Sequence, residues 1–166
     1  MEIKVNGEPL VIEGKQVEVG DLAPNATLVN RKGETVQLKD LLSDKVTILS
    51  VVPNILTRTC ELQTKRLSDE TKSGDIQYLT VSRNTPQEFN TWNQENELDV
   101  DTLTDESGEF GRAYGLDINL DGNDLLARTV YVVDQNGVIQ YREIVEELTE
   151  EPTYKQPLQV AKNALK

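Results

Sequence analysis

Residues 46–52, Val-Thr-Ile-Leu-Ser-Val-Val, form a short and largely apolar run between polar segments. A run of this length and composition is typical of a strand buried in the centre of a sheet. Such a strand delivers the residues that follow it, Pro53 to Thr59, as a loop at the C-terminal edge of the sheet. Sites in open α/β sheets usually lie at that edge. The run therefore predicts an α/β domain and indicates where its site should be.

Cys60, the only cysteine of the 166 residues, follows this loop at the predicted start of a helix. Unpaired backbone N–H groups and the positive end of the helix dipole stabilise an anion at such a position, so a thiol there ionises more easily. Cys60 is therefore a candidate nucleophile. The alternative is that Cys60 is a small buried hydrophobic residue, as free cysteines usually are.

The composition excludes several classes of function. The sequence has no histidine, which excludes histidine-based triads, general bases and metal sites. One cysteine excludes an intramolecular disulfide and a cysteine metal cluster. The net charge of −12 disfavours nucleic acid and anionic membranes as partners. Without a leader or a long apolar stretch, the expected location is the cytosol.

Acidic residues gather in three segments. Residues 117–124 alternate acidic and amide side chains, but they lack the spacing to a glutamate that a calcium loop needs, and we interpret them as a polar loop without metal. Residues 99–109 and 143–151 are interpreted as solvated faces.

The chain shows no repeat, low-complexity tract or linker, so residues 1–166 are predicted to form one domain. Asn6-Gly7 between apolar runs predicts a hairpin within residues 1–15. Thr85, Pro86 and Glu88 form a capping box for a helix that continues through Trp92, itself interpreted as a packing residue. The other predicted strands are 26–29, 35–38, 46–52, 76–81, 102–104, 125–133 and 138–142, and the other predicted helices are 61–72, 110–114 and 154–165.

The order of these elements predicts the fold class. An early strand–helix–strand unit followed by a late hairpin implies a mixed α/β sheet with helices on both faces. This is the plan of a thioredoxin-like fold.

Short motifs occur in a characteristic order along nearly the whole chain. They are the Asn6-Gly7 hairpin, Val19–Pro24, Leu49–Pro53 followed by Thr57 and Cys60, Gln63–Arg66, Phe110–Gly115 and Leu125–Asp134. Together they resemble the bacterial thiol peroxidases, a branch of the peroxiredoxins. The resemblance implies a thioredoxin-like fold with an extra N-terminal hairpin.

The resemblance also implies roles for four residues. Cys60 would be the peroxidatic cysteine, Thr57 the hydroxyl that holds the peroxide, Arg128 the cation beside the sulfur, and Pro53 the shield of the loop. A guanidinium can donate several hydrogen bonds to charge that moves from sulfur to oxygen. No metal or organic cofactor is required. Taken singly, Arg128 could be an ordinary strand arginine and Thr57 a helix cap.

The sequence departs from the family pattern at the resolving cysteine. The family carries this second cysteine on the helix after the third strand, and the matching position here is Asn93. An amide cannot attack a sulfenic acid to form a disulfide. Oxidised Cys60 must therefore meet a small thiol, a separate protein thiol or a backbone nitrogen.

The loop before Cys60 also departs from the family pattern. Asn54, Leu56, Arg58 and Thr59 stand where serine, aspartate, glycine and valine are usual. Loss of a carboxylate and gain of a cation favour an anionic sulfur electrostatically.

The favoured function is a thiol-dependent peroxidase that reduces hydrogen peroxide or alkyl hydroperoxides by a one-cysteine mechanism. An external reductant, either a small thiol or a thioredoxin-like protein, is its expected partner, and the resemblance implies a homodimer. One alternative is a peroxide sensor or thiol-adduct binding protein on the same scaffold. Another is a purely structural module with an unreactive Cys60.

Overall fold

The computed structural model describes residues 1–12, 14–72 and 74–165. The predicted domain 1–166 and hairpin 1–15 include residues 13, 73 and 166, which lie outside the described residues. The strands are β1 (Glu2–Val5), β2 (Glu8–Val11), β3 (Thr27–Asn30), β4 (Thr35–Gln37), β5 (Thr47–Val51), β6 (Gln77–Ser82), β7 (Thr102–Thr104), β8 (Asp117–Leu120), β9 (Asn123–Leu126), β10 (Thr129–Val133) and β11 (Ile139–Ile144). The helices are α1 (Leu38–Leu42), α2 (Arg58–Glu70), α3 (Pro86–Glu95), α4 (Glu109–Tyr114) and α5 (Lys155–Ala164).

Seven strands form the main sheet, in the order β11-β10-β5-β6-β7-β3-β4. Strands β5, β6 and β7 run parallel, while β10, β11, β3 and β4 extend the sheet in antiparallel pairs. Strand β5, predicted as the central strand, has β10 on one side and β6 on the other, and all its residues are buried. The sheet is mixed, as predicted.

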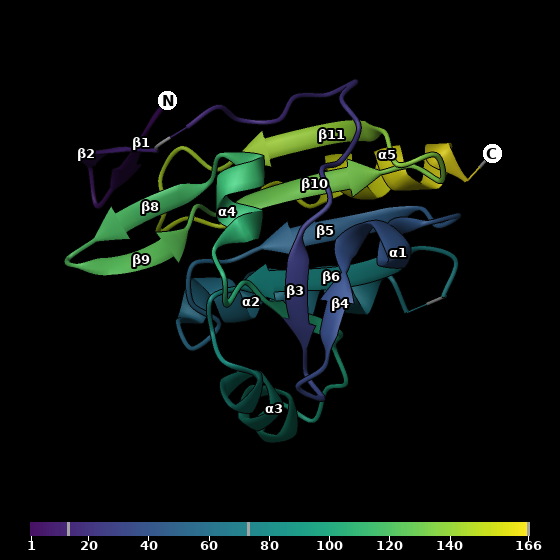
Figure 1. Ribbon diagram of the computed structural model, residues 1–166, viewed down its shortest axis with the longest axis horizontal. Helices are drawn as coiled ribbons and strands as arrows, with labels where there is room; N and C mark the ends of the chain where they lie inside the picture. Colours follow the sequence, from purple (N-terminus) through teal and green to yellow (C-terminus); the bar gives the residue numbers. More distant parts are fainter. Residues whose placement is uncertain (13, 73, 166) are drawn as a thin grey trace.

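Helices cover both faces of this sheet (Figure 1). Alternate residues of β5 show the division, because Ile48 belongs to a cluster with Leu67 of α2 and Leu158 of α5. Leu49 belongs to the larger cluster on the other face, which includes Phe110 of α4. This period-two alternation is what a strand buried on both faces requires.

A third apolar cluster lies where β5 ends. It contains Val52, Ile55, Cys60, Phe89 and Trp92, together with Val100. Helix α3 supplies the two aromatic residues and begins with the predicted capping box, since Thr85 accepts from the N–H of Glu88 and the Glu88 carboxylate accepts from the N–H of Thr85. Trp92 is a packing residue, as predicted, and is 4% exposed.

The predicted N-terminal hairpin is present as β1 and β2, joined at Asn6 and Gly7 with positive φ angles at both residues. It docks on the segment after β11. The carboxylate of Glu147 accepts from the backbone N–H groups of Asn6 and Gly7 at 3.1 and 2.8 Å. Lys4 adds two backbone hydrogen bonds. Its N–H donates to the carbonyl of Glu146, and its carbonyl accepts from the N–H of Leu148.

Two interpretations of the polar segments are wrong. Residues 117–124 are not a loop but belong to the β8–β9 hairpin, whose turn at Asp121-Gly122 has positive φ at both residues. An Asp-Gly turn is a hairpin signal, and the polar composition of the flanking residues concealed it. The predicted strand 125–133 is accordingly divided between the end of β9 and β10.

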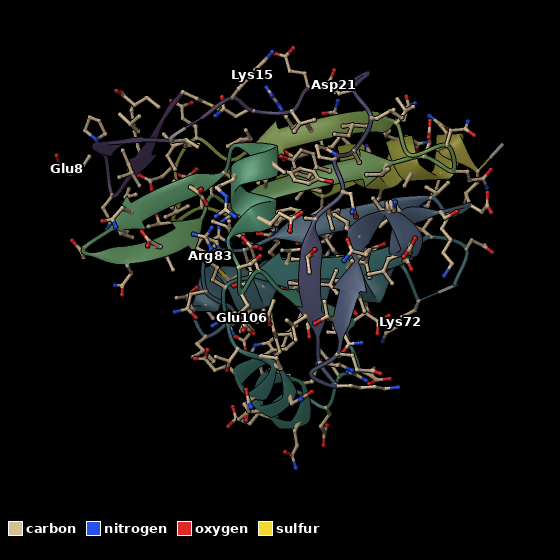
Figure 2. The ribbon with its side chains drawn as sticks, in the orientation of Figure 1. Glu8, Lys15, Asp21, Lys72, Arg83 and Glu106 are labelled. Carbon is tan, nitrogen blue, oxygen red and sulfur yellow. The ribbon has the colours of Figure 1, made fainter. Side chains whose placement is uncertain are left out.

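The interpretation of residues 99–109 as a solvated face fails at Asp105, which is 1% exposed. Its carboxylate accepts from the N–H groups of Phe110 and Gly111 at 3.1 and 3.0 Å, and so supports the first turn of α4. Arg83, labelled below the β8–β9 hairpin in Figure 2, pairs with both Asp105 and Asp117. Paired in this way, a buried carboxylate is tolerated.

Most of the other elements appear as predicted, with ends displaced by a few residues. Helix α2 begins at Arg58 rather than at residue 61, so Cys60 lies within its first turn. The predicted strand 35–38 ends at Gln37, because Leu38 begins the short helix α1, which the sequence analysis missed. In the described part of the chain, no helix is both long and apolar enough to cross a membrane.

The contact between the hairpin and Glu147 predicts a pH-dependent stability. Hydrogen bonds from the Thr149 N–H and then the Gly7 N–H lower the pKa of Glu147 to about 2 from 4.5. A lowered pKa means that the stabilisation is complete above the unfolded value and is lost as pH falls through the folded one. The free energy of unfolding of the wild type should therefore exceed that of Glu147→Gln near neutral pH, and the difference should shrink below about pH 4.5.

Urea titrations of both proteins at a series of pH values measure this difference. Glu146→Gln, which removes the same charge from the adjacent residue, is the matched control. A difference for Glu147→Gln that stays constant down to about pH 2.5 would contradict the prediction.

Candidate active site

Cys60 is placed by the end of β5 and the start of α2. The chain leaves β5 after Val51, turns through residues 52–57 and enters α2 at Arg58, which makes Cys60 the third residue of the helix. Cys60 is buried, with an exposed fraction of 0%, and packs in the third cluster beside residues of α3. The sulfur thus lies at the C-terminal edge of the parallel strands, where the sequence analysis placed the site.

Arg128 reaches the sulfur from the start of β10, the antiparallel neighbour of β5. Antiparallel pairing of β10 with β5 matches Thr129 to Val51, so Arg128, one residue earlier, lies beside the loop that leaves β5. Its Nη1 donates to Cys60 Sγ at 3.2 Å. Arg128 is 3% exposed, and a buried guanidinium this close to sulfur stabilises negative charge there more than it would in water.

Two further acceptors hold the guanidinium in this orientation. Nη1 also donates to Oε1 of Gln63 at 3.0 Å, and Nε donates to the carbonyl of Leu148 at 2.9 Å. Gln63 lies one turn after Cys60 on α2 and is fully buried. Its Nε2 donates in turn to Oγ of Ser50 on β5 at 2.7 Å. The four side chains and one carbonyl form a connected network around the sulfur.

Two contributors to the network were not predicted from the sequence, Gln63 and Leu148. Gln63 begins the motif Gln63–Arg66, and its position three residues after Cys60 places both side chains on one face of a helix. Leu148 contributes a backbone carbonyl, for which side-chain chemistry gives no signal.

Thr57 and Pro53 belong to the loop before the helix. Pro53 is buried and Thr57 is exposed. The Thr57 hydroxyl donates to the carbonyl of Asn54 at 2.8 Å, and it does not cap the helix. In this conformation the hydroxyl is therefore engaged by the loop itself, while Arg128 and Cys60 are in direct contact.

A pair of amides fixes the same loop. Asn84, just after β6, accepts from the N–H of Ile55 at 2.8 Å and donates to the side chain of Asn54 at 3.0 Å. The Asn54 side chain also accepts from the N–H of Leu56 at 3.0 Å. Asn54 thus has a structural function in this chain.

The two departures that alter the local charge, Leu56 and Arg58, are exposed to solvent. The side chain of Arg58 is 74% exposed and pairs with Glu61 at 2.7 Å, which offsets much of the cation it adds. Leu56 is 57% exposed. The expected gain of about two units of local positive charge is therefore smaller at the sulfur, since exposed charges are screened by water.

Asn93, at the position matched to the resolving cysteine, is buried and forms hydrogen bonds with the backbone of Val100. Its Nδ2 donates to the carbonyl of Val100 at 3.2 Å, and its Oδ1 accepts from the Val100 N–H at 3.0 Å. This pair of bonds ties α3 to the segment that enters β7. The side chain is thus committed to a structural contact.

The arrangement has the parts needed for thiolate chemistry: a sulfur at the start of a helix, a guanidinium in contact with it, and apolar surroundings. The network accepts and donates hydrogen bonds without a histidine. A model of the redoxin family matches residues 18–158.

The chain belongs to the redoxin family. Within that family, the chain is similar to thiol peroxidases over its full length. The chain is 40% identical over 168 aligned residues to the thiol peroxidase of Bacillus subtilis (strain 168), covering 99% of each chain. It is 37% identical to the thiol peroxidase of Halalkalibacterium halodurans, covering 98% of each chain. The resemblance found in the sequence motifs is confirmed.

Solved structures of this family share the fold. A peroxiredoxin-like protein from Aquifex aeolicus superposes with a TM-score of 0.89 at 25% identity, covering 98% of this chain and 96% of that one. The thiol peroxidase from Chromobacterium violaceum gives the same TM-score, 0.89, at 14% identity, covering 99% and 98%. The predicted thioredoxin-like fold is confirmed.

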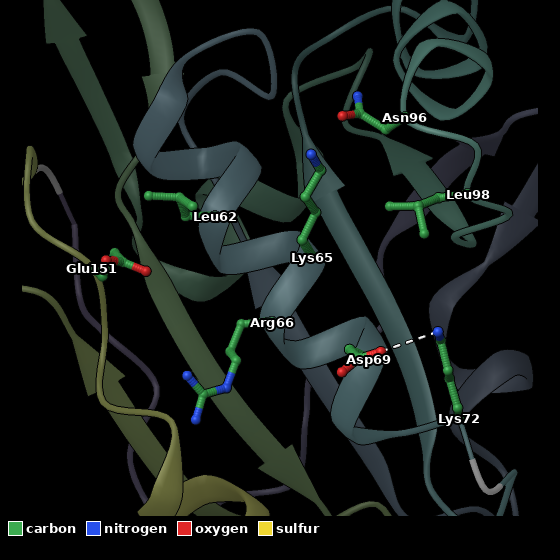
Figure 3. A pocket seen from close by; sticks show the side chains of 8 residues that line it. All are labelled: Leu62, Lys65, Arg66, Asp69, Lys72, Asn96, Leu98 and Glu151. Carbon is green, nitrogen blue, oxygen red and sulfur yellow. Dashed lines mark ion pairs between the residues drawn. The ribbon is translucent and has the colours of Figure 1, made fainter.

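The cavity shown in Figure 3 lies outside this redoxin site. It has a volume of about 450 Å³ and runs along the outer side of α2, where Leu62, Lys65 and Asp69 line it. Asn96 and Leu98, from the end of α3 and the segment after it, line it on one side of α2, and Glu151 lines it on the other. Cys60 faces the apolar cluster rather than this cavity.

Gln63→Leu tests the support of Arg128. Leucine fills a similar volume but leaves Arg128 Nη1 and the Ser50 hydroxyl without this partner, which should cost about 1–3 kcal/mol of unfolding free energy. A less fixed guanidinium should also slow the reaction of Cys60 with hydrogen peroxide by about tenfold, as measured by stopped-flow fluorescence of Trp92. Ser50→Ala is the control, because it leaves the Gln63–Arg128 bond intact and should keep the rate. An unchanged rate in Gln63→Leu would show that Arg128 does not need this support.

Asn93→Ala separates a structural role from a role in turnover. Loss of both bonds to Val100 should lower the unfolding free energy by about 1–3 kcal/mol. Peroxide consumption with excess external thiol should stay at the wild-type rate, because the amide contributes no nucleophile. Asn90→Ala, which removes one exposed bond to the Arg31 carbonyl, should destabilise less. A large loss of turnover in folded Asn93→Ala would contradict this assignment.

Proposed function

We propose that the chain is a thiol-dependent peroxidase that reduces hydrogen peroxide or alkyl hydroperoxides through Cys60 with an external thiol. The contact of Arg128 Nη1 with Cys60 Sγ at 3.2 Å is the observation that carries the proposal. Membership of the redoxin family and full-length similarity to thiol peroxidases support it.

In the first step, the Cys60 thiolate attacks one peroxide oxygen in line with the O–O bond. An S–O bond forms, the O–O bond breaks, and the leaving oxygen departs as hydroxide or alkoxide. It becomes water or an alcohol by taking up a proton from solution, which balances the proton that the Cys60 thiol had released. Arg128 stabilises the charge at both ends of this movement, because its guanidinium donates along fixed directions. We assign to Thr57 the hydroxyl that turns from Asn54 to hold the peroxide, and to Pro53 the exclusion of water from the loop.

Peroxide must reach a sulfur that has no exposed surface in this conformation. The loop of residues 53–57 therefore has to open at least locally. Opening has to break the hydrogen bonds of the loop to Asn84 and the packing of Ile55 in the third cluster.

In the second step, an external thiol attacks the sulfenic acid of Cys60 and releases water to form a mixed disulfide. A second thiol then restores Cys60 and leaves as an external disulfide. The sequence offers no second cysteine for an internal route. A small thiol or a thioredoxin-like protein fits this requirement equally, and a homodimer in the cytosol stays a prediction.

Peroxide consumption per chain under excess dithiothreitol tests the proposal. The wild type should consume many equivalents, and Cys60→Ser should consume none above the uncatalysed rate. Intact mass spectrometry after peroxide alone should show one added oxygen, and dithiothreitol should remove it. Consumption of a single equivalent with Cys60 left oxidised would instead indicate the sensor or adduct-forming protein. No consumption that depends on Cys60 would overturn the peroxidase function.

A further inference from the structure

The N-terminal hairpin and the Cys60 site contact the same short segment, residues 146–149. On the hairpin side, the Glu147 carboxylate accepts from the N–H of Asn6 at 3.1 Å and from that of Gly7 at 2.8 Å. It also accepts from the N–H of Thr149 at 3.1 Å and from the Thr149 hydroxyl at 2.8 Å. The Glu147 side chain thus joins the turn of the hairpin to Thr149, two residues after Glu147.

The backbone of the hairpin adds to this attachment. The N–H of Leu148 donates to the carbonyl of Lys4 at 2.8 Å, and the N–H of Lys4 donates to the carbonyl of Glu146 at 2.7 Å. The Leu148 side chain is buried in the main cluster, with 5% of its surface exposed. Leu148 is therefore fixed by bonds on both sides of its peptide and by its packing.

On the active-site side, two consecutive carbonyls of this segment bind residues of the site. The Leu148 carbonyl accepts from Arg128 Nε at 2.9 Å. The Thr149 carbonyl accepts from the hydroxyl of Thr59, the neighbour of Cys60, at 3.0 Å. The segment is thus bound to the hairpin through the Glu147 carboxylate, the Glu146 carbonyl and the Leu148 N–H, and to the site through two carbonyl groups.

We propose that Glu147 is a positioning residue for Arg128, which it orients through the Leu148 carbonyl. A guanidinium is planar, so the direction of its Nε–H bond sets the direction of Nη1. Nη1 in turn divides its donation between Cys60 Sγ and Gln63 Oε1. Release of residues 146–149 from the hairpin would let Arg128 turn away from the sulfur. This inference rests on the proposed role of Arg128 at Cys60.

The charges around Glu147 are compatible with this role. Lys4 pairs with Glu146 at 3.9 Å, and both of these side chains are largely exposed. Glu147 makes its bonds to neutral donors, which hold their geometry through the backbone of a turn. The hairpin is thereby a part of the active-site support, even though its own residues do not touch Cys60 in these contacts.

Glu147→Gln tests the inference, with Glu146→Gln as the matched control for charge and location. In Glu147→Gln one carboxylate oxygen becomes an NH₂ group that cannot accept from the turn or from Thr149. We expect the rate constant for Cys60 oxidation by hydrogen peroxide to fall by about threefold to tenfold, as for loss of a charge-assisted bond. We also expect the pH profile of Cys60 alkylation by iodoacetamide to move to higher pH. Glu146→Gln should leave both unchanged.

A double-mutant cycle with Arg128→Met identifies the path. If Glu147 acts through Arg128, then Glu147→Gln should not change the alkylation profile further in the Arg128→Met background. A purely structural role would lower the urea midpoint without moving the alkylation profile. Wild-type values for both rate and profile in folded Glu147→Gln would overturn the inference while leaving the peroxidase function intact. Absence of peroxide turnover in the wild type would overturn the proposed function, while the alkylation cycle would still decide the role of Glu147.

Discussion

A guanidinium almost wholly removed from water, held against a sulfur atom, is the constraint around which this structure is arranged. Burial of a charge without partners costs several kcal/mol or more, so Arg128 can occupy its place only where acceptors meet it. Three are present: Cys60 Sγ, Gln63 Oε1 and the Leu148 carbonyl. An anionic sulfur completes this set best, because it alone neutralises the cation. The energetic requirement of the arginine and the chemical requirement of the thiolate are therefore met by the same contact.

The fold brings Arg128 and its acceptors together from three segments of the chain. Strand β5 delivers the loop and helix that carry Cys60 and Gln63, its antiparallel neighbour β10 places Arg128, and the chain after β11 returns Leu148. The partners of Arg128 are separated from it by 68, 65 and 20 residues in the sequence. A site built from such distant segments is only as rigid as their attachments. Bonds remote from the sulfur, such as those in the Glu147 segment, are therefore expected to affect its surroundings.

Local patterns predicted the elements that carry their own signals. The apolar run at 46–52, the capping box at Thr85 and the Asn6-Gly7 turn each specify a conformation within a few residues, and each was found. The motif resemblance singled out the cysteine and the arginine that the structure brings together. The failures have two causes. Asp105 and Glu147 looked solvated by composition, but an acidic residue that accepts from backbone N–H groups has the same composition as one in water. Only the three-dimensional arrangement distinguishes the two. The β8–β9 hairpin was missed because polar flanking residues concealed the signal of its Asp121-Gly122 turn.

Because asparagine occupies the position of the resolving cysteine, oxidised Cys60 has no internal thiol to react with while it is buried. Asn93 binds the Val100 backbone, so α3 contributes packing around Cys60 and no sulfur chemistry. A sulfenic acid formed at Cys60 would wait in the apolar cluster with Phe89 and Trp92 until the loop opens. Because further oxidation of a cysteine follows its exposure, the closed loop protects that intermediate. The same opening that admits a thiol also admits a second peroxide. The fate of each oxidised Cys60 therefore depends on the concentrations of thiol and peroxide and on their rate constants, and a higher thiol-to-peroxide ratio favours turnover.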